Sequence, residues 1–150
     1  MPMKSFKAKI ASGGIDTLSL HTNDGSTGYR IKKLELMAEN YANATEVVLK
    51  IYSVPQESVT NTIDFSDNTL LAAAFLDNPT AAHNYPVGPS VIFDNITFNQ
   101  DVYITAIDNS GSARDSNYYI ELEQVKLNLD ENTVATLKDI RNITGWVLTK

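Results

Sequence analysis

The sequence predicts an all-β fold, an antiparallel β-sandwich of jelly-roll type with seven to nine strands and one C-terminal helix. Short runs alternate apolar and polar residues, which is the period of a strand whose side chains point to opposite faces in turn. Clusters of Asn, Asp, Gly and Ser separate these runs at regular intervals, as turns do in sandwiches. The clearest runs are Tyr29–Met37, Glu46–Tyr52, Val91–Phe98, Asp101–Ile107 and Tyr118–Leu127.

The first strands are predicted from alternation alone. Phe6–Ile10 and Thr17–Thr22 alternate and are separated by a glycine-rich turn. In Tyr29–Met37 the apolar side chains change face halfway along the run. An extra residue in the strand, a β-bulge near Lys32-Lys33, would return them to one face.

The middle of the chain contains one ambiguous run. Glu46–Tyr52 is predicted as a strand that ends at Pro55 or lies at the edge of a sheet, because proline cannot donate to a ladder. Gln56–Asn68 is predicted as a long loop with one short strand. Leu70–Leu76 suits a helix by propensity, but its short length and neighbouring strands favour a buried strand. The proline-rich Asp77–Ser90 is predicted as a loop.

The later strands are predicted as a hairpin followed by a closing strand. Val91–Phe98 and Asp101–Ile107 are separated only by Asn99-Gln100, which predicts a tight connection between them. A turn-rich loop at Asn109–Asn117 precedes Tyr118–Leu127. In that strand Tyr118, Ile120 and Leu122 are expected to point inward.

The period of the pattern changes near the C-terminus. Apolar residues now recur three apart, at Val134, Leu137, Ile140 and Ile143, which predicts a helix near residues 131–142. Gly145 suits the position just past a helix end, and Trp146-Val147-Leu148 follow as an apolar tail. We therefore expect a single domain over residues 1–150, with the sandwich in 1–128 and the helix and tail in 129–150.

Composition excludes several classes of function. The net charge of −6 disfavours non-specific binding to nucleic acid, and the chain contains no cysteine for a disulfide, a thiolate metal site or a nucleophile. No apolar run approaches the length of a membrane helix, and we expect no secretory signal at the N-terminus.

Candidate catalytic and metal sites are weak in this sequence. His21 and His83 stand apart, and no G-x-S-x-G motif accompanies them. Glu121 and Glu123 share a strand face at a spacing compatible with glycoside hydrolysis, although solvated acidic residues show the same spacing. Three loop aspartates could hold a structural calcium, but without EF-hand spacing: Asp64, Asp67 and Asp77. We predict no enzyme, no catalytic residue, no cofactor and no metal site.

Aromatic residues offer a rival hypothesis. Tyrosine rings pack on sugar rings, so a carbohydrate-binding module is an alternative, although buried tyrosines are also common in strands. The candidate tyrosines are Tyr41, Tyr85, Tyr103 and Tyr119. Trp146, the only tryptophan, either folds back on the sandwich or anchors a partner.

Three stretches carry a family resemblance. Tyr29–Leu36, the Asn/Ala/Thr loop at 40–45 and Glu46–Tyr52 resemble small β-sandwich virion proteins of tailed, marine-type bacteriophages. Val91–Phe98 with Asp101–Thr105 looks like the next hairpin of those proteins, and Asn117–Lys126 like their closing strand. The resemblance covers residues 6–127 and leaves out the C-terminal helix and tail.

The resemblance implies a structural protein of the virion, assembled in the cytoplasm of a bacterial host. Its role would be to decorate or cement the capsid, or to form a connector or fibre part. Its partners would be the major capsid protein or another virion protein, with further copies of itself in a trimer. The residues expected at partner interfaces are Phe6, Ile10, Trp146, Val147 and Leu148, with no nucleic acid or membrane involved. The alternative is a carbohydrate-binding or tail- and fibre-associated sandwich module.

Overall fold

The computed structural model describes residues 2–79 and 87–128, which form eight β-strands. All of their pairings are antiparallel. The strands are β1 (Met3–Ile10), β2 (Ile15–Leu18), β3 (Thr27–Ala38), β4 (Thr45–Tyr52), β5 (Leu70–Asn78), β6 (Val87–Phe93), β7 (Val102–Asp108) and β8 (Ser116–Lys126).

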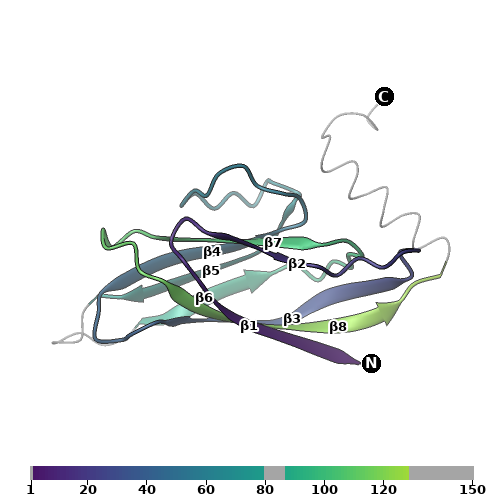
Figure 1. The fold of residues 1–150 in the computed structure, drawn as a ribbon, viewed down its shortest axis with the longest axis horizontal. Helices are drawn as coiled ribbons and strands as arrows, with labels where there is room; N and C mark the ends of the chain where they lie inside the picture. The colour runs from purple at the N-terminus through teal and green to yellow at the C-terminus, as the bar shows by residue number, and fades with distance from the viewer. Residues whose placement is uncertain (1, 80–86, 129–150) are drawn as a thin grey trace.

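The strands form two sheets that face each other across one core (Figure 1). One sheet has three strands in the order β1-β8-β3, and the other has five in the order β2-β7-β4-β5-β6. Three of the strand pairs are nested along the sequence: β4 and β5 lie between the partners β2 and β7, which lie between the partners β1 and β8. The predicted all-β, sandwich-like architecture is confirmed. The predicted C-terminal helix lies outside the described residues.

Alternate side chains build the core, as the period of two requires. Tyr118, Ile120 and Leu122 of β8 are buried, as predicted. Tyr29 and Ile31 in the first half of β3 and Leu34 and Leu36 in the second half are also buried, because the pairing register shifts between Ile31 and Lys33. The predicted β-bulge is therefore confirmed.

Several predicted boundaries change. Leu70–Leu76 is a strand, as favoured, but β5 continues to Asn78. The predicted loop at 77–90 is wrong at both ends, since β6 begins at Val87. The second strand runs over Ile15–Leu18 rather than 17–22. The segment 56–68 contains no strand and consists of bends and turns.

The predicted hairpin between Val91–Phe98 and Asp101–Ile107 is wrong. β6 ends at Phe93 on the edge of the five-stranded sheet, whereas β7 lies between β2 and β4. Between them the chain crosses to the other sheet, where Phe98 forms an isolated bridge with Tyr29 of β3. The bridge has two backbone hydrogen bonds, and the two rings stack with their centroids 6.2 Å apart. This crossing connects the two layers.

Candidate interaction surfaces

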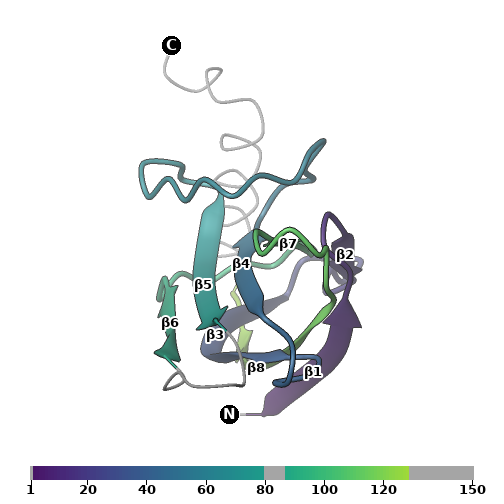
Figure 2. The same ribbon diagram turned by 90° about the vertical axis from the view of Figure 1, so that its left-hand side faces the viewer.

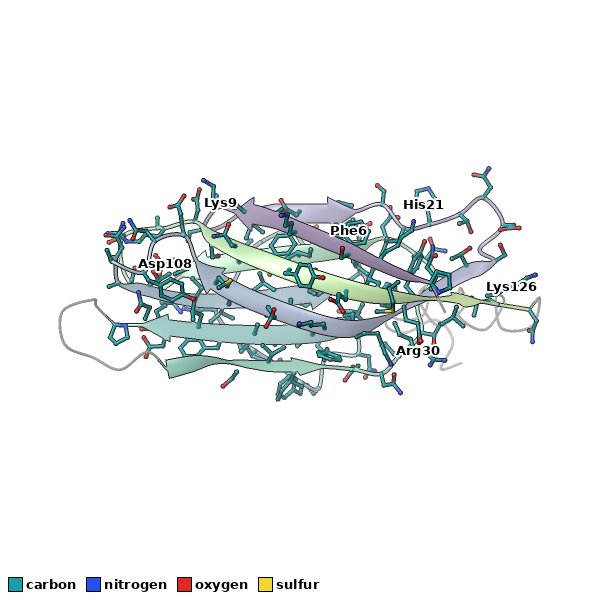
Figure 3. All side chains as sticks on the ribbon, turned by 90° about the horizontal axis from the view of Figure 1, so that it is seen from below. Phe6, Lys9, His21, Arg30, Asp108 and Lys126 are labelled. Atoms are coloured by element: carbon teal, nitrogen blue, oxygen red, sulfur yellow. The ribbon has the colours of Figure 1, made fainter. Side chains whose placement is uncertain are left out.

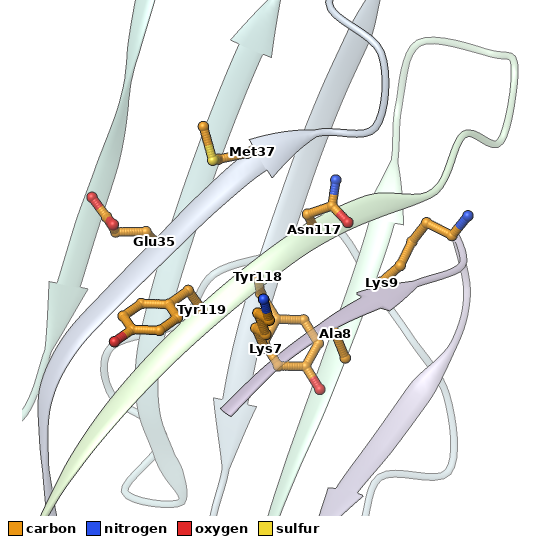
Figure 4. Close-up of a pocket in the computed structure, with 8 residues that line it drawn as sticks. All are labelled: Lys7, Ala8, Lys9, Glu35, Met37, Asn117, Tyr118 and Tyr119. Carbon is orange, nitrogen blue, oxygen red and sulfur yellow. The ribbon is translucent and has the colours of Figure 1, made fainter. Parts of the chain in front are cut away.

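The outer face of the three-stranded sheet carries a groove of about 420 Å³. We call this face the open face. Its side chains form two rows across the strands: Tyr119 stands between Lys7 and Glu35 in register, and Asn117 stands between Lys9 and Met37. Figure 4 shows these residues along β1, β8 and β3. Met37 is 58% exposed, so the groove offers apolar surface between charged groups.

Hydrogen bonds and ion pairs hold several groups of the open face in place. The Tyr119 hydroxyl donates to Oε2 of Glu121 at 2.6 Å, and this bond raises the pKa of Tyr119. Lys33 Nζ lies 6.0 Å from the centroid of the Tyr119 ring. Lys9 Nζ donates to Oε2 of Glu39 at 2.9 Å, which raises the pKa of Lys9. The tyrosine ring is thus oriented within a mixed field of charges.

A second surface lies on the opposite side of the molecule, over the five-stranded sheet. The segment between β4 and β5, residues 53–69, lies on the side of this sheet that faces away from the three-stranded sheet, as Figures 1 and 2 both show. We call this segment the strap. Lys50 of β4 is only 1% exposed; its Nζ donates to Thr60 Oγ1 at 3.0 Å and to the Thr62 carbonyl at 2.7 Å. Burial lowers the pKa of Lys50.

The strap directs the Thr60 hydroxyl and the Thr62 carbonyl toward Lys50 in the sheet, and it exposes two large apolar side chains to solvent. Phe65 is 66% exposed and Ile63 is 39% exposed, while Ile92 of β6 is 56% exposed. A groove of about 280 Å³, which we call the strap groove, lies between them. It is lined by Phe65, Leu70, Leu71, Ala72, Ile92 and Asp94.

The sequence-predicted interface residues have different positions. Ile10 is 2% exposed and belongs to the core, so it presents no surface to a partner in the described chain, and its assignment to an interface is corrected. Phe6 is half-buried and packs against the same core. Both side chains point inward because they occupy alternate positions of β1, on the face of the sheet that packs against the core. Trp146, Val147 and Leu148 lie outside the described residues.

The candidate tyrosines do not come together. Tyr119 lies on the open face, whereas Tyr103 belongs to β7 of the other sheet and Tyr41 to the connection between β3 and β4. Tyr85 lies outside the described residues. Sequence reasoning missed Met37 and Phe65, two of the most exposed apolar side chains. The only signal was Phe65 flanked by polar residues in a loop.

The acidic candidates make local contacts. Asp64 Oδ1 accepts from the amide and hydroxyl of Ser66, and Asp67 Oδ1 accepts likewise from Thr69. Asp77 belongs to β5, apart from this turn. Within residues 2–79 and 87–128 no three His, Asp or Glu side chains gather as metal ligands would.

The remaining candidate residues also have defined partners. His21 Nδ1 lies 2.7 Å from Asp101 Oδ1, which also accepts from the amides of Leu20 and His21. Glu121 accepts from Tyr119, and Glu123 lies 3.8 Å from the Arg30 guanidinium. His83 lies outside the described residues. Among the described residues, no helix is long and apolar enough to cross a membrane.

Comparison with known proteins adds little to this description. No protein-family model matches the sequence, and no curated protein matches it either. A crystal structure of the Yersinia pseudotuberculosis-derived mitogen is similar over 86% of this chain and 88% of that one, with 13% identity and a TM-score of 0.32. The surfaces therefore have to be interpreted from their own residues.

Proposed function

We propose that this protein is a non-enzymatic structural component of a bacteriophage virion that decorates or cements the capsid. The sequence resemblance over residues 6–127 supports this role. The nested strand pairing also supports it, because such nesting is the order of a jelly roll, an architecture that viral capsid proteins use. We infer the jelly roll from this order of strands. The protein would assemble into virions in the cytoplasm of the bacterial host.

The main support for this proposal is the open face, which would bind the major capsid protein or another virion protein. Tyrosine and methionine are enriched at protein interfaces, and a flexible methionine adapts to the shape of its partner. Tyr119 and Met37 lie diagonally across β8 and β3 there, in the two neighbouring rows, with charges of both signs around them. In the described chain no other segment covers this face, as Figure 3 shows from that side.

We propose a homotrimer as the assembled form. The two sheets leave β1, β3, β2 and β6 at their edges, where unpaired backbone groups favour further pairing. Lysines on β1 protect that edge, whereas β6 carries no charged residue and only Pro89 as a protecting residue, so β6 is the edge better suited to self-association. Light scattering of the purified chain measures the stoichiometry.

Mass spectrometry of purified phage particles tests the virion role. We expect the chain to be present after extensive washing. Its absence from particles that infect normally would end the virion proposal.

The alternative function is carbohydrate binding at the open face. The oriented Tyr119 ring, with Asn117, Glu35 and Lys7 around one groove, favours it, because sugar sites combine an aromatic face with a few polar groups. The groove volume lies within the usual range for small-ligand sites. A glycan array separates the two functions: saturable binding by the wild type that is lost in Tyr119→Ala would favour the sugar-binding module.

A further inference from the structure

The strap groove is lined mainly by apolar residues, two of which are more than half exposed, Phe65 at 66% and Ile92 at 56%. Phe65 and Ile92 form its two sides, and the buried Leu70, Leu71 and Ala72 form its floor. Apolar groups left in water cost free energy, and clustered ones mark surfaces that are covered in the working protein. We infer that residues 129–150 of the same chain cover this groove, with their apolar residues against Phe65 and Ile92.

The sequence of residues 129–150 suits this site. Its apolar residues recur three apart, so that a helix would place them along one face. They are Val134, Leu137, Ile140 and Ile143, and Trp146 follows in the apolar tail. Such a stripe gains stability only against another apolar surface.

Charge selects this groove over the one on the open face. Asp94 lines the strap groove, and Asp64 and Asp67 flank Phe65 on the strap. In the C-terminal segment Lys138 and Arg141 directly follow two stripe residues, with Asp139 between them, while the acidic Asp130 and Glu131 lie before the stripe. The open-face groove instead carries both signs of charge, with Lys7 and Lys9 beside Glu35. Two strap grooves packed against each other would bring their aspartates together, which disfavours a second copy as the occupant.

The chain leaves the sandwich at a point from which residues 129–150 can reach the strap groove. A methyl group placed on Gly28 would lie 3.2 Å from the Leu127 side chain and 2.8 Å from that of Thr97, so Leu127 and Thr97 flank the same point. Thr97 is five residues from Ile92, a path of at most about 17 Å in extended chain. Residues 129–150 would span about 33 Å even as a continuous helix. An intramolecular contact of this kind also has a high effective concentration.

Trp146 gives a direct test, because it is the only tryptophan of the chain. Its fluorescence emission and its quenching by acrylamide would be measured in the full-length protein, for the wild type, Phe65→Ser and Ile92→Ser. Met37→Ser, an equally exposed substitution on the open face, is the control. We expect a red shift and stronger quenching in both strap-groove variants, independent of protein concentration, and neither change in the control.

Unchanged emission in both variants would overturn the inference. A change that appears only as the protein is concentrated would also overturn it, since a neighbouring copy would then supply the segment. The absence of cysteine allows a second measurement that does not depend on the serine variants. In full-length Asn68→Cys/Lys138→Cys we expect an intramolecular disulfide under mild oxidation, and in Lys7→Cys/Lys138→Cys none; equal yields would contradict the docking. Neither readout uses phage particles, so the result is independent of the virion proposal.

Discussion

The hydroxyl of Tyr118 donates a hydrogen bond to Oδ2 of Asp16 at 2.8 Å, and this bond joins the two sheets. Tyr118 belongs to the central strand of the three-stranded sheet and is 4% exposed, whereas Asp16 belongs to the edge strand β2 of the other sheet. Apolar packing between sheets has no direction, but this bond fixes where β2 lies relative to β8. It therefore contributes to the register of the sandwich as well as to its stability.

We predict that Tyr118→Phe lowers the free energy of unfolding by about 1–2 kcal/mol, because a bond to a charged acceptor is lost while the ring stays packed. Urea denaturation measures this change. Tyr119→Phe is the matched control: it removes a similar bond, to Glu121, on the outer face of the same strand. That loss should stay within about 0.5 kcal/mol. Equal losses would mean that the Tyr118 bond has no special role between the sheets.

We predict that the advantage of the wild type over Tyr118→Phe narrows above pH 10. Burial, together with the bond to Asp16, raises the pKa of Tyr118, whereas an unfolded tyrosine titrates near pH 10. The folded state then keeps a proton that the unfolded state releases. The contribution is thus full below about pH 10 and falls by up to about 1.4 kcal/mol per pH unit above it. Urea titrations of both proteins from pH 8 to 11 measure it, and a constant difference would contradict the prediction.

Asp108, which is labelled in Figure 3, accepts hydrogen bonds from the turns at one end of the sandwich. It is 7% exposed, and its two carboxylate oxygens accept from the amides of Glu46, Ser110 and Arg114 and from the Ser110 hydroxyl. Burial alone would raise the pKa of Asp108, but these hydrogen bonds outweigh it and the pKa is lowered. The carboxylate therefore stabilises the folded chain above about pH 4, and this contribution is lost as the pH falls through the lowered pKa.

We predict that Asp108→Asn lowers the free energy of unfolding by about 2–3 kcal/mol at pH 7. The NH₂ group that replaces one carboxylate oxygen would face N–H and O–H donors and cannot accept from them. The variant should also lose part of the acid sensitivity of the wild type. Thermal and urea unfolding at pH 7 and pH 3 check both effects. Asp115→Asn, which removes a surface carboxylate 4.0 Å from Lys9, serves as the control and should change little.

We predict that Lys50→Met leaves the melting temperature unchanged or raises it. The Lys50 ammonium donates to two neutral oxygens, and burial lowers its pKa more than the Asp67 carboxylate raises it, so it keeps a desolvation cost that a methionine of similar length avoids. The strap, however, loses its two contacts with Lys50 Nζ, so the amides of residues 57–66 should exchange hydrogen faster. Exchange mass spectrometry compares this variant with Lys33→Met on the open face. A large loss of stability without faster exchange would show that Lys50 supports the sheet rather than the strap.

The local sequence pattern predicts where most strands lie, but not which strands pair with each other. The alternation in Tyr29–Met37 was informative enough to locate a bulge, because a strand can keep its apolar residues on one face after a change of phase only by inserting a residue. Asn99-Gln100 was misleading, because a crossing between sheets and a tight hairpin both need a short polar break. Lys50 occupies an outward position of β4, where a lysine is expected in solvent. Its burial depends on where the strap lies, and no local pattern encodes that position.

Quantitative mass spectrometry of purified virions tests the central claim most directly. Phage particles would be produced with the wild-type chain, with Met37→Glu on the open face, and with Ile63→Glu on the strap, on the opposite side of the molecule, as the control. We predict a copy number comparable with that of the major capsid protein for the wild type and for the control Ile63→Glu, and a loss of most copies for Met37→Glu, whose folding is checked separately. Absence of the wild-type chain from the particles, or full incorporation of folded Met37→Glu, would contradict the proposal that this protein joins the virion through its open face.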